Sequence, residues 1–336
     1  MKKKILIIGS YGSSNIGDEA ILESILKNLP ENSEKFVLSG NPKFTEETYK
    51  VKSAIHLPFG FRSFFSFKWI KSFIFLKKTD LVVLGGGGLF TDEYTLKAVF
   101  LWTWHVFWAK VFRKRIIQFS VSVGEMKTWL GEKLTTWSLK QCEKIIVRDQ
   151  ISEKIVKKLS PMSEVILGTD VVFQWNEDLS KIKRSNFIAI SLRDWEIDLS
   201  AINDFINSCL SKNYRVLLIP MEDNDEVILR EYVKHHHVFM AIPENFSELL
   251  QILKTCEKAI GMRLHFLIAA AIAGCKVGGI SYSSKVKGIL DELELLHISP
   301  KEISLGNLEN LFKKVSIAKN LEAQKKKAVE MFKELL

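Results

Sequence analysis

Short hydrophobic runs rich in Ile, Val and Leu alternate along the chain with longer segments whose apolar residues recur at helical spacing. Runs of the first kind are typical of buried strands, and segments of the second kind are typical of amphipathic helices. The repeated strand–helix order predicts parallel sheets that are covered by helices. In the first half we expect strands over residues 4–8, 36–38, 81–84, 116–120, 144–147 and 165–167.

The second half repeats this pattern. There we expect strands over residues 187–191, 215–220, 239–242, 258–260 and 277–281. Helices are expected over residues 202–210, 226–235, 247–255, 264–273 and 286–293. Each half is therefore predicted to be a Rossmann-like, doubly wound α/β domain.

The stretch 175–186 is polar and lacks periodicity, so we place the linker there. The prediction is an N-terminal domain over 1–175 and a C-terminal domain over 186–315. Residues 321–336 carry Leu321, Ala328, Phe332 and Leu335 at helical spacing. We expect a C-terminal helix over 319–336 that packs back on the first domain.

Composition narrows the class of protein. Hydrophobic residues make up 47% and charged residues 26%, as in ordinary globular proteins. No apolar run approaches the roughly 20 residues that cross a bilayer, and the N-terminus lacks a signal peptide's hydrophobic region, so a cytoplasmic protein is expected. The formal net charge of +9 comes from Lys spread among Glu, which disfavours nucleic acid and leaves a membrane surface or anionic small substrates.

Metal and disulfide chemistry are not predicted. The four cysteines, Cys142, Cys209, Cys256 and Cys275, are scattered without a CxxC spacing. Asp223-Asn224-Asp225 resembles the Asp-x-Asp of metal–nucleotide transferases, but it is better explained as a helix start. His235-His236-His237 is expected at the end of that helix, where adjacent imidazoles point in different directions.

A glycine-rich loop follows the first expected strand, at Gly9-Ser-Tyr-Gly12-Ser-Ser-Asn15-Ile-Gly17-Asp18-Glu19. Backbone amides of Gly12 and Asn15 in such a loop can approach an anion at a helix N-terminus. The spacing matches neither GxGxxG nor a P-loop. Asp18 and Glu19 fall in the first helical turn, where helix capping and contact with substrate both remain open interpretations.

A second glycine run, 85–88, is expected as a loop directly after the strand 81–84 and before Asp92. Four successive glycines lose much backbone entropy on folding, which favours close approach of a ligand to Gly86 and Gly87. Tight packing of another backbone is the alternative. Both loops lie at carboxyl ends of strands, where open α/β sheets bind ligands.

Basic residues stand at the ends of several expected strands. Arg263 and His265 flank Leu264 at a strand-to-helix turn, Lys285 opens the next helix, and Arg148 and Arg193 each follow a strand. Cations at a helix N-terminus oppose its dipole, so an anion between them is predicted. A purely structural, hydrogen-bonded imidazole remains the alternative for His265. Together these side chains indicate a site for a multiply charged anion.

The whole set resembles the polysaccharide pyruvyltransferase family. The resemblance rests on the glycine-rich loop and helix 9–22, on 85–92, Val147-Arg148-Asp149, Ser191-Leu192-Arg193, Gly261-Met262-Arg263-Leu264-His265 and Ser281-Tyr282-Ser283-Ser284-Lys285-Val286. It implies a glycosyltransferase-B-like fold, with the two domains facing across a cleft, and phosphoenolpyruvate as donor. Members often carry Asp-Pro where Ser283 and Ser284 stand, which puts loop rigidity or acceptor choice in doubt.

The resemblance also implies the reaction and its residues. The pyruvyl group would pass to a sugar of a cell-envelope polysaccharide or its lipid-linked precursor as a ketal. Phosphoenolpyruvate would be a co-substrate, without cofactor or metal, and a lipid-linked amino sugar such as one containing N-acetylmannosamine would be the acceptor. The expected catalytic residues are His265, Arg263 and Lys285. The expected binding residues are Arg148, Arg193, Leu264, Gly12, Asn15, Asp18, Gly86, Gly87 and Asp92.

Several alternatives stay open at this stage. Asp18 and Asp92 are both candidates for the base. The segment 61–76 mixes aromatic and basic residues, which suits either a membrane interface at the inner face of the cell membrane or a buried helix. A nucleotide-sugar glycosyltransferase of the same fold is the second prediction of function. A non-catalytic glycan-binding protein is the third, although a neutral sugar would not require this set of cations.

Overall fold

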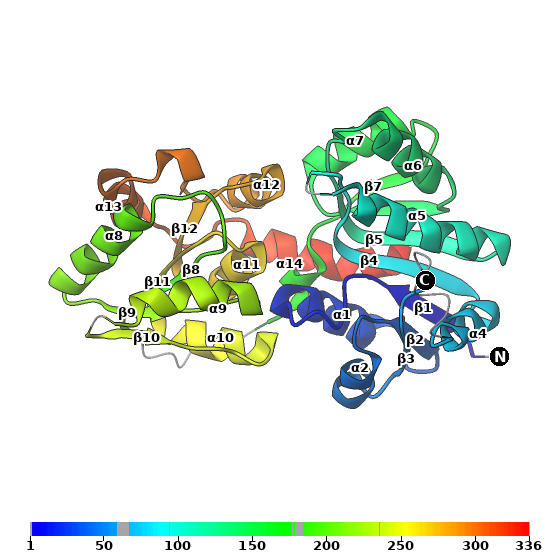
Figure 1. Ribbon diagram of the computed structural model, residues 1–336, viewed down its shortest axis with the longest axis horizontal. Helices are drawn as coiled ribbons and strands as arrows, with labels where there is room; N and C mark the ends of the chain where they lie inside the picture. The colour runs from blue at the N-terminus through cyan, green and yellow to red at the C-terminus, as the bar shows by residue number, and fades with distance from the viewer. Residues whose placement is uncertain are drawn as a thin grey trace. The chain divides into compact units, whose positions relative to one another are not determined.

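The computed structural model describes residues 2–58, 67–93, 95–176, 178, 184–234 and 236–335. They form two compact units, each with its own sheet and flanking helices (Figure 1). Unit 1 consists of Met1–Ser13, Ile21–Val171 and Lys326–Leu336, and unit 2 consists of Ser14–Ala20 and Val172–Lys325. The assignment of residues 14–20 to unit 2 is a feature that the sequence analysis did not anticipate.

Unit 1 contains a seven-stranded parallel sheet in the order β3-β2-β1-β4-β5-β6-β7. Its strands are β1 (Lys4–Ile8), β2 (Glu34–Leu38), β3 (Lys52–Ala54), β4 (Leu81–Phe90), β5 (Arg115–Val123), β6 (Lys144–Val147) and β7 (Val165–Leu167). The helices are α1 (Ile16–Asn28), of which the part up to Ala20 belongs to unit 2, α2 (Pro42–Tyr49), α4 (Ile70–Lys78), α5 (Leu96–Val111), α6 (Trp129–Lys140) and α7 (Gln150–Leu159).

Unit 2 contains a six-stranded parallel sheet in the order β10-β9-β8-β11-β12-β13. Its strands are β8 (Ser185–Ser191), β9 (Arg215–Leu218), β10 (Val238–Met240), β11 (Cys256–Gly261), β12 (Lys276–Ile280) and β13 (His297–Ile298). The helices are α8 (Leu199–Ser211), α9 (Asp223–Leu229), α10 (Phe246–Lys254), α11 (Leu264–Ile272), α12 (Ser284–Glu292), α13 (Leu305–Lys314) and α14 (Leu321–Glu330). Short 3-10 turns cover Val171–Gln174, Arg230–Tyr232, Pro300–Glu302 and Met331–Glu334. The prediction of two doubly wound α/β domains is confirmed.

Side chains that alternate between the two faces of each strand form the core of unit 1. Leu6 and Ile8 of β1 point to the same face of the sheet as Val82 and Leu84 of β4, because successive strand residues face opposite sides. These side chains are buried in one cluster with residues of α4 and α5, among them Val106. Fully covering a Leu, Ile or Val contributes about 1.5–3 kcal/mol each, so this layer fixes α4 and α5 against the sheet.

The end of the chain returns to the sheet of unit 1. The Phe332 ring lies 4.9 Å from the Phe119 ring of β5, measured between centroids. The backbone N–H of Thr169 donates to the sulfur of Met331, and the ammonium of Lys144 pairs with Glu334 at 2.6 Å. The last residues therefore cover β5 and β6.

The glycine run 85–88 differs from its prediction. It lies inside β4, which continues to Phe90, and not in a loop after a strand that ends at Leu84. Gly86 has φ +67, and a Cβ placed there would come within 2.1 Å of Cγ2 of Ile21 in α1. This position needs glycine because the side chain of Ile21 packs directly on the strand, whereas the alternative given from the sequence was the packing of another backbone.

The helix expected over 226–235 also differs. It begins at Asp223, which confirms the prediction that Asp223-Asn224-Asp225 starts a helix, and it ends at Leu229 before a 3-10 turn. Acidic residues in the first turn favour the early start because they complement the helix dipole. His236 and His237 lie in the turn before β10, and His235 falls outside the described residues.

Two histidines meet beneath α5 in unit 1. Their rings lie 5.3 Å apart, and Nδ1 of His105 donates to the carbonyl oxygen of Leu101 at 2.7 Å. Nε2 of His105 then accepts from the backbone N–H of Leu57 at 3.3 Å, which requires the neutral imidazole. His56 is half-buried as a residue, but its Nδ1 is enclosed. Burial lowers the pKa of His56 to about 3, helped by His105, and that of His105 to about 4.

This histidine pair predicts a specific loss of stability in mild acid. Both imidazoles stay neutral in the folded protein, whereas in the unfolded chain they take up protons below a pH of about 6.5. Stability is therefore full above that pH and declines as the pH falls toward the folded values. Between pH 7.5 and 5.5 we expect a loss of about 2–3 kcal/mol in the free energy of unfolding, measured with urea. The double variant His56→Gln, His105→Gln should show a much flatter decline. An unchanged slope would refute the assignment.

Candidate active site

Three adjacent strands of unit 2 end beside the predicted basic residues. The order β8-β11-β12 places their carboxyl ends at one edge of the parallel sheet. Arg193 follows β8, Arg263 and His265 follow β11, and Lys285 follows β12. Because this edge is where open α/β sheets bind ligands, we treat it as the candidate site.

Arg263 is held by two carboxylates. Its Nε donates to Oδ2 of Asp225 at 2.9 Å, and its Nη2 donates to both Oδ1 of Asp225 and Oε1 of Glu222. These bonds use the Nε and Nη2 donors, and the two N–H groups of Nη1 make no hydrogen bond among the described residues. The carboxylates therefore fix the plane of the guanidinium and leave one end of it for an acceptor.

Burial and hydrogen bonding together determine how the pKa values of Asp225 and Arg263 shift. Asp225 is fully buried, and burial raises the pKa of its carboxyl, against the opposing hydrogen bonds from Arg263. Burial would lower the pKa of Arg263, but the hydrogen bonds to Asp225 outweigh it and raise the pKa. The guanidinium thus keeps its charge, and a bidentate Arg–carboxylate pair has a well-defined geometry.

His265 lies against the first turn of α1. A Cβ added to Gly17 would come within 1.9 Å of Nδ1 of His265, so the imidazole fits only because residue 17 has no side chain. Both residues belong to unit 2. Sequence reasoning singled out the glycine-rich loop as an anion cradle but did not find this role for Gly17.

Asn15 ties the same turn to Glu222. Its Oδ1 accepts from the backbone N–H groups of Gly17 at 3.0 Å and Asp18 at 3.2 Å, and its Nδ2 donates to Oε2 of Glu222 at 3.1 Å. The N–H of Ile16 donates to the carbonyl oxygen of Met221. Glu222 thereby links Asn15 to Arg263, so the start of α1, the start of α9 and the start of α11 form one network.

Arg193 lies between two aromatic rings. Its guanidinium carbon is 5.2 Å from the ring centroid of Trp195 and 4.6 Å from that of Tyr282. The rings themselves are 5.0 Å apart. Stacking on aromatic faces restrains the guanidinium while its N–H groups stay available to an oxyanion.

Besides Nε2 of His265, three buried polar atoms at this edge have no hydrogen-bond partner among the described residues. They are Nε of Arg193, Oγ of Ser191 at the end of β8, and Oγ of Ser283 just before α12. Leaving such a group unsatisfied costs about 1–3 kcal/mol, so native proteins rarely do so without a reason. A ligand with several oxygen acceptors would satisfy all three.

The N-termini of α11 and α12 also belong to the candidate site. Leu264 is the first residue of α11 and is buried, so it can offer a ligand its backbone rather than its side chain. Lys285 is the second residue of α12 and is half-buried. Two helix N-termini thus open at this edge beside Arg193, Arg263 and Lys285, an arrangement that favours anions.

Asp18 belongs to unit 2 with Asn15, whereas Arg148, Gly12, Gly86, Gly87 and Asp92 lie in unit 1. Arg148 is 2% exposed, pairs with the buried Asp170 at 2.7 Å and donates from Nε to Ser122. This geometry gives Arg148 a structural role, and we do not carry it into the donor site. Gly12 has φ +74, and a Cβ there would meet the turn at Ser39, so packing accounts for this glycine as it does for Gly86.

The carboxylate of Asp92 is also used in hydrogen bonds within unit 1. Its carboxylate accepts hydrogen bonds from the backbone N–H groups of Lys127 and Thr128 and from Oγ1 of Thr128. Burial alone would raise the pKa of Asp92, but these hydrogen bonds outweigh burial and lower the pKa. A carboxylate with its oxygens so used is a poor general base. Gly87 is buried in β4.

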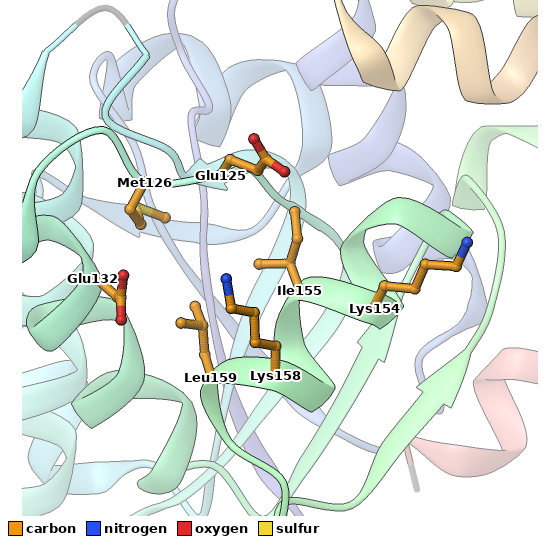
Figure 2. A pocket seen from close by; sticks show the side chains of 7 residues that line it. All are labelled: Glu125, Met126, Glu132, Lys154, Ile155, Lys158 and Leu159. Atoms are coloured by element: carbon orange, nitrogen blue, oxygen red, sulfur yellow. The ribbon is translucent and has the colours of Figure 1, made fainter.

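A separate groove of about 340 Å³ lies in unit 1, bordered by the segment after β5 and by α6 and α7. Figure 2 shows Met126, Ile155, Leu159 and Lys158 close together, with Lys154 extending away from them. Glu125 and Glu132 add negative charge. Because both signs of charge line an apolar floor, the groove favours no single class of charged ligand, and it contains none of the predicted site residues.

The two parallel-sheet α/β units have a fold of the glycosyltransferase-B type. Among solved structures, the chain is similar to the UDP-GlcNAc 2-epimerase from Methanocaldococcus jannaschii, with a TM-score of 0.68 and 11% identity over 99% of each chain. It is also similar to Anabaena Alr3699/HepE in complex with UDP-glucose, with a TM-score of 0.65 and 13% identity over 99% of this chain and 98% of that one. At such low identity these likenesses establish the fold alone.

The chain belongs to the polysaccharide pyruvyl transferase family, whose model matches residues 15–284. A curated relative is the amylovoran biosynthesis protein AmsJ of Erwinia amylovora, 22% identical over 97% of this chain and 95% of that protein. The resemblance stated from the sequence is confirmed. The protein is therefore a transferase of polysaccharide biosynthesis in its general function.

Proposed function

We propose that this protein transfers the pyruvyl group of phosphoenolpyruvate to a sugar of a cell-envelope polysaccharide, or to the lipid-linked precursor of one, and forms a pyruvate ketal. One observation carries the choice of donor. Buried donors on Arg193, Ser191 and Ser283, which have no hydrogen-bond partner in the described part of the chain, lie at the edge where α11 and α12 begin. Phosphoenolpyruvate carries a phosphate and a carboxylate, which supply enough acceptors for these groups.

In the proposed binding mode, the two anionic groups of phosphoenolpyruvate are bound by residues at different strand ends. The stacked guanidinium of Arg193 and the hydroxyl groups hold one anionic group, and Nη1 of Arg263 together with Lys285 holds the other. Asp225 and Glu222 act as positioning residues because they orient Arg263 without touching the donor. Charge-assisted hydrogen bonds of this kind are roughly twice as strong as neutral ones.

The chemistry delivers one proton to carbon and removes two protons from sugar hydroxyls, and the second of these ends on the departing phosphate. A proton adds to the methylene carbon of phosphoenolpyruvate, and a sugar hydroxyl attacks the adjacent carbon and loses its proton. The bond from that carbon to the phosphate oxygen then breaks and inorganic phosphate leaves. A second hydroxyl of the same sugar attacks the same carbon and loses its proton, which closes the ketal. We assign the proton donor to His265, since imidazole ionises near neutral pH, and one proton acceptor to Asp18.

Ligand binding tests the donor directly. Phosphoenolpyruvate should raise the unfolding temperature of the protein, because a ligand that binds only the folded state stabilises it. UDP and UDP-glucose at the same concentration should not. Stabilisation by UDP or UDP-glucose without any effect of phosphoenolpyruvate would favour the nucleotide-sugar glycosyltransferase instead. Stabilisation by none of them would argue against both donors.

The packing of His265 on Gly17 gives a second prediction. Gly17→Ala places a methyl group where the imidazole lies, so His265 must move. Because misplacement by about 1 Å can cost a hundredfold in rate, we expect kcat for pyruvyl transfer to fall by about tenfold or more. Gly306→Ala is the matched control, since a Cβ at that position meets nothing within 4 Å. Unchanged kcat in Gly17→Ala would show that the contact does not position the imidazole.

A further inference from the structure

Helix α5 of unit 1 is apolar on both of its faces. Its inner face, with Trp102 and Val106, is buried in the core. On its outer face Phe107 is 40% exposed and Val111 is 52% exposed. A helix that is apolar all round is normally covered on every side, so the outer face of α5 requires a partner.

The exposed apolar surface extends to the neighbouring helices. Ile70 and Ile74 of α4 and Trp137 of α6 are also exposed. Ring contacts join the three helices: Phe73 lies 4.8 Å from Trp108, and Phe107 lies 6.4 Å from Trp137, between centroids. Figure 1 shows α5 and α6 as neighbours in unit 1. We call this face, with Ile70, Ile74, Phe107, Val111 and Trp137, the α4–α6 surface.

The charge around this surface has one sign. Helices α4, α5 and α6 together carry seven lysines and a single acidic residue, Glu132. Lys77 and Lys78 end α4 and are exposed, and Lys110 stands beside Val111. Lys133 of α6 lies 4.7 Å from the ring centroid of the exposed Trp129. Interleaved aromatic, aliphatic and basic side chains suit a partner surface that has an apolar interior and anionic groups at its boundary with water.

We propose that the α4–α6 surface docks unit 1 on an anionic lipid bilayer, with the apolar side chains in the interface and the lysines at the headgroups. Charge complementarity decides between this partner and a second copy of the chain. A two-fold contact would bring the same lysines against one another, which is unfavourable. A bilayer with anionic headgroups satisfies both kinds of side chain.

The mode of attachment is peripheral. Among the described residues no helix is long and apolar enough to cross a membrane. The proposal stands on the α4–α6 surface and does not depend on the proposed function. If the acceptor is lipid-linked, docking would also hold the enzyme beside it.

Co-sedimentation with vesicles tests the surface. We expect the wild type to bind vesicles of equal parts phosphatidylglycerol and phosphatidylcholine at low salt, and to bind phosphatidylcholine alone weakly. Ile74→Glu with Phe107→Glu should lower the bound fraction by about tenfold, because two apolar side chains leave the interface. Met162→Glu is the matched control, since Met162 is an exposed apolar residue of unit 1 that lies outside this surface.

A charge-reversal variant separates the contribution of the lysines to vesicle binding from that of the apolar side chains. Lys77→Glu with Lys78→Glu should abolish the preference for phosphatidylglycerol, and high salt should weaken binding of the wild type. Failure of the wild type to bind the anionic vesicles would overturn the proposal. Dimerisation seen by light scattering, lost in Ile74→Glu with Phe107→Glu and unaccompanied by vesicle binding, would assign the surface to a second copy. Transfer to a soluble acceptor should be unchanged in every variant, so a failed docking surface remains distinct from a failed reaction.

Discussion

Replacing His265 with asparagine is expected to lower kcat for pyruvyl transfer by about a hundredfold or more while the protein stays folded. Asparagine is smaller than histidine and fits the space against Gly17, but it cannot deliver a proton to the methylene carbon. In the proposed binding mode Arg193, Arg263 and the helix starts hold the donor, so its affinity should change much less than kcat. Steady-state kinetics with thermal unfolding of the same samples measures both.

The matched control for this variant is His236→Asn. His236 is an exposed histidine of the same unit, in the turn before β10, and should keep full activity. Full turnover by His265→Asn would remove His265 from the chemistry and leave it a structural imidazole. A fall in affinity without a fall in kcat would make it a binding residue instead.

The second large effect concerns stability rather than catalysis. Arg148→Met should lower the free energy of unfolding of unit 1 by about 3–5 kcal/mol, because it removes the cation that pairs with the buried carboxylate of Asp170. Asp170→Asn should cost a similar amount by leaving the guanidinium unpaired. The double variant Arg148→Met, Asp170→Leu should recover part of the loss, since no uncompensated charge remains.

An exposed pair of the same chemistry provides the control. Arg115 and Glu143 form a bidentate pair, with side chains 52% and 46% exposed. Arg115→Met should therefore cost less than about 1 kcal/mol in urea unfolding. If Arg148→Met were as mild as Arg115→Met, the buried pair would not have the structural role assigned to it, and Arg148 would again be a candidate for phosphate binding.

Much of the fold could be predicted because buried parallel strands have a clear sequence pattern. β1, β6 and β7 begin and end where the hydrophobic runs do. β3 and β13 were missed because each is short and carries polar residues at the edge of a sheet. β4 was cut short because glycine has no strand propensity, although packing of Ile21 on Gly86 keeps the chain in the sheet there.

The candidate site could be predicted only in part. Parallel topology places the residues after β8, β11 and β12 at one edge, so Arg193, Arg263 and Lys285 were found from strand ends alone. Their partners were not, because Asp225 lies 38 residues from Arg263 and no local pattern joins them. Arg148 follows a strand just as Arg193 does, yet its guanidinium binds a buried carboxylate, that of Asp170. Whether a cation faces a ligand or a carboxylate depends on tertiary packing.

The most direct test of the central claim is release of inorganic phosphate from phosphoenolpyruvate in the presence of a panel of lipid-linked amino sugars, with the product mass determined in the same reaction. The account predicts phosphate release that depends on acceptor, together with a product heavier by one pyruvylidene group. Absence of phosphate release with every acceptor, with transfer of a sugar from a UDP-sugar to the same panel, would contradict it.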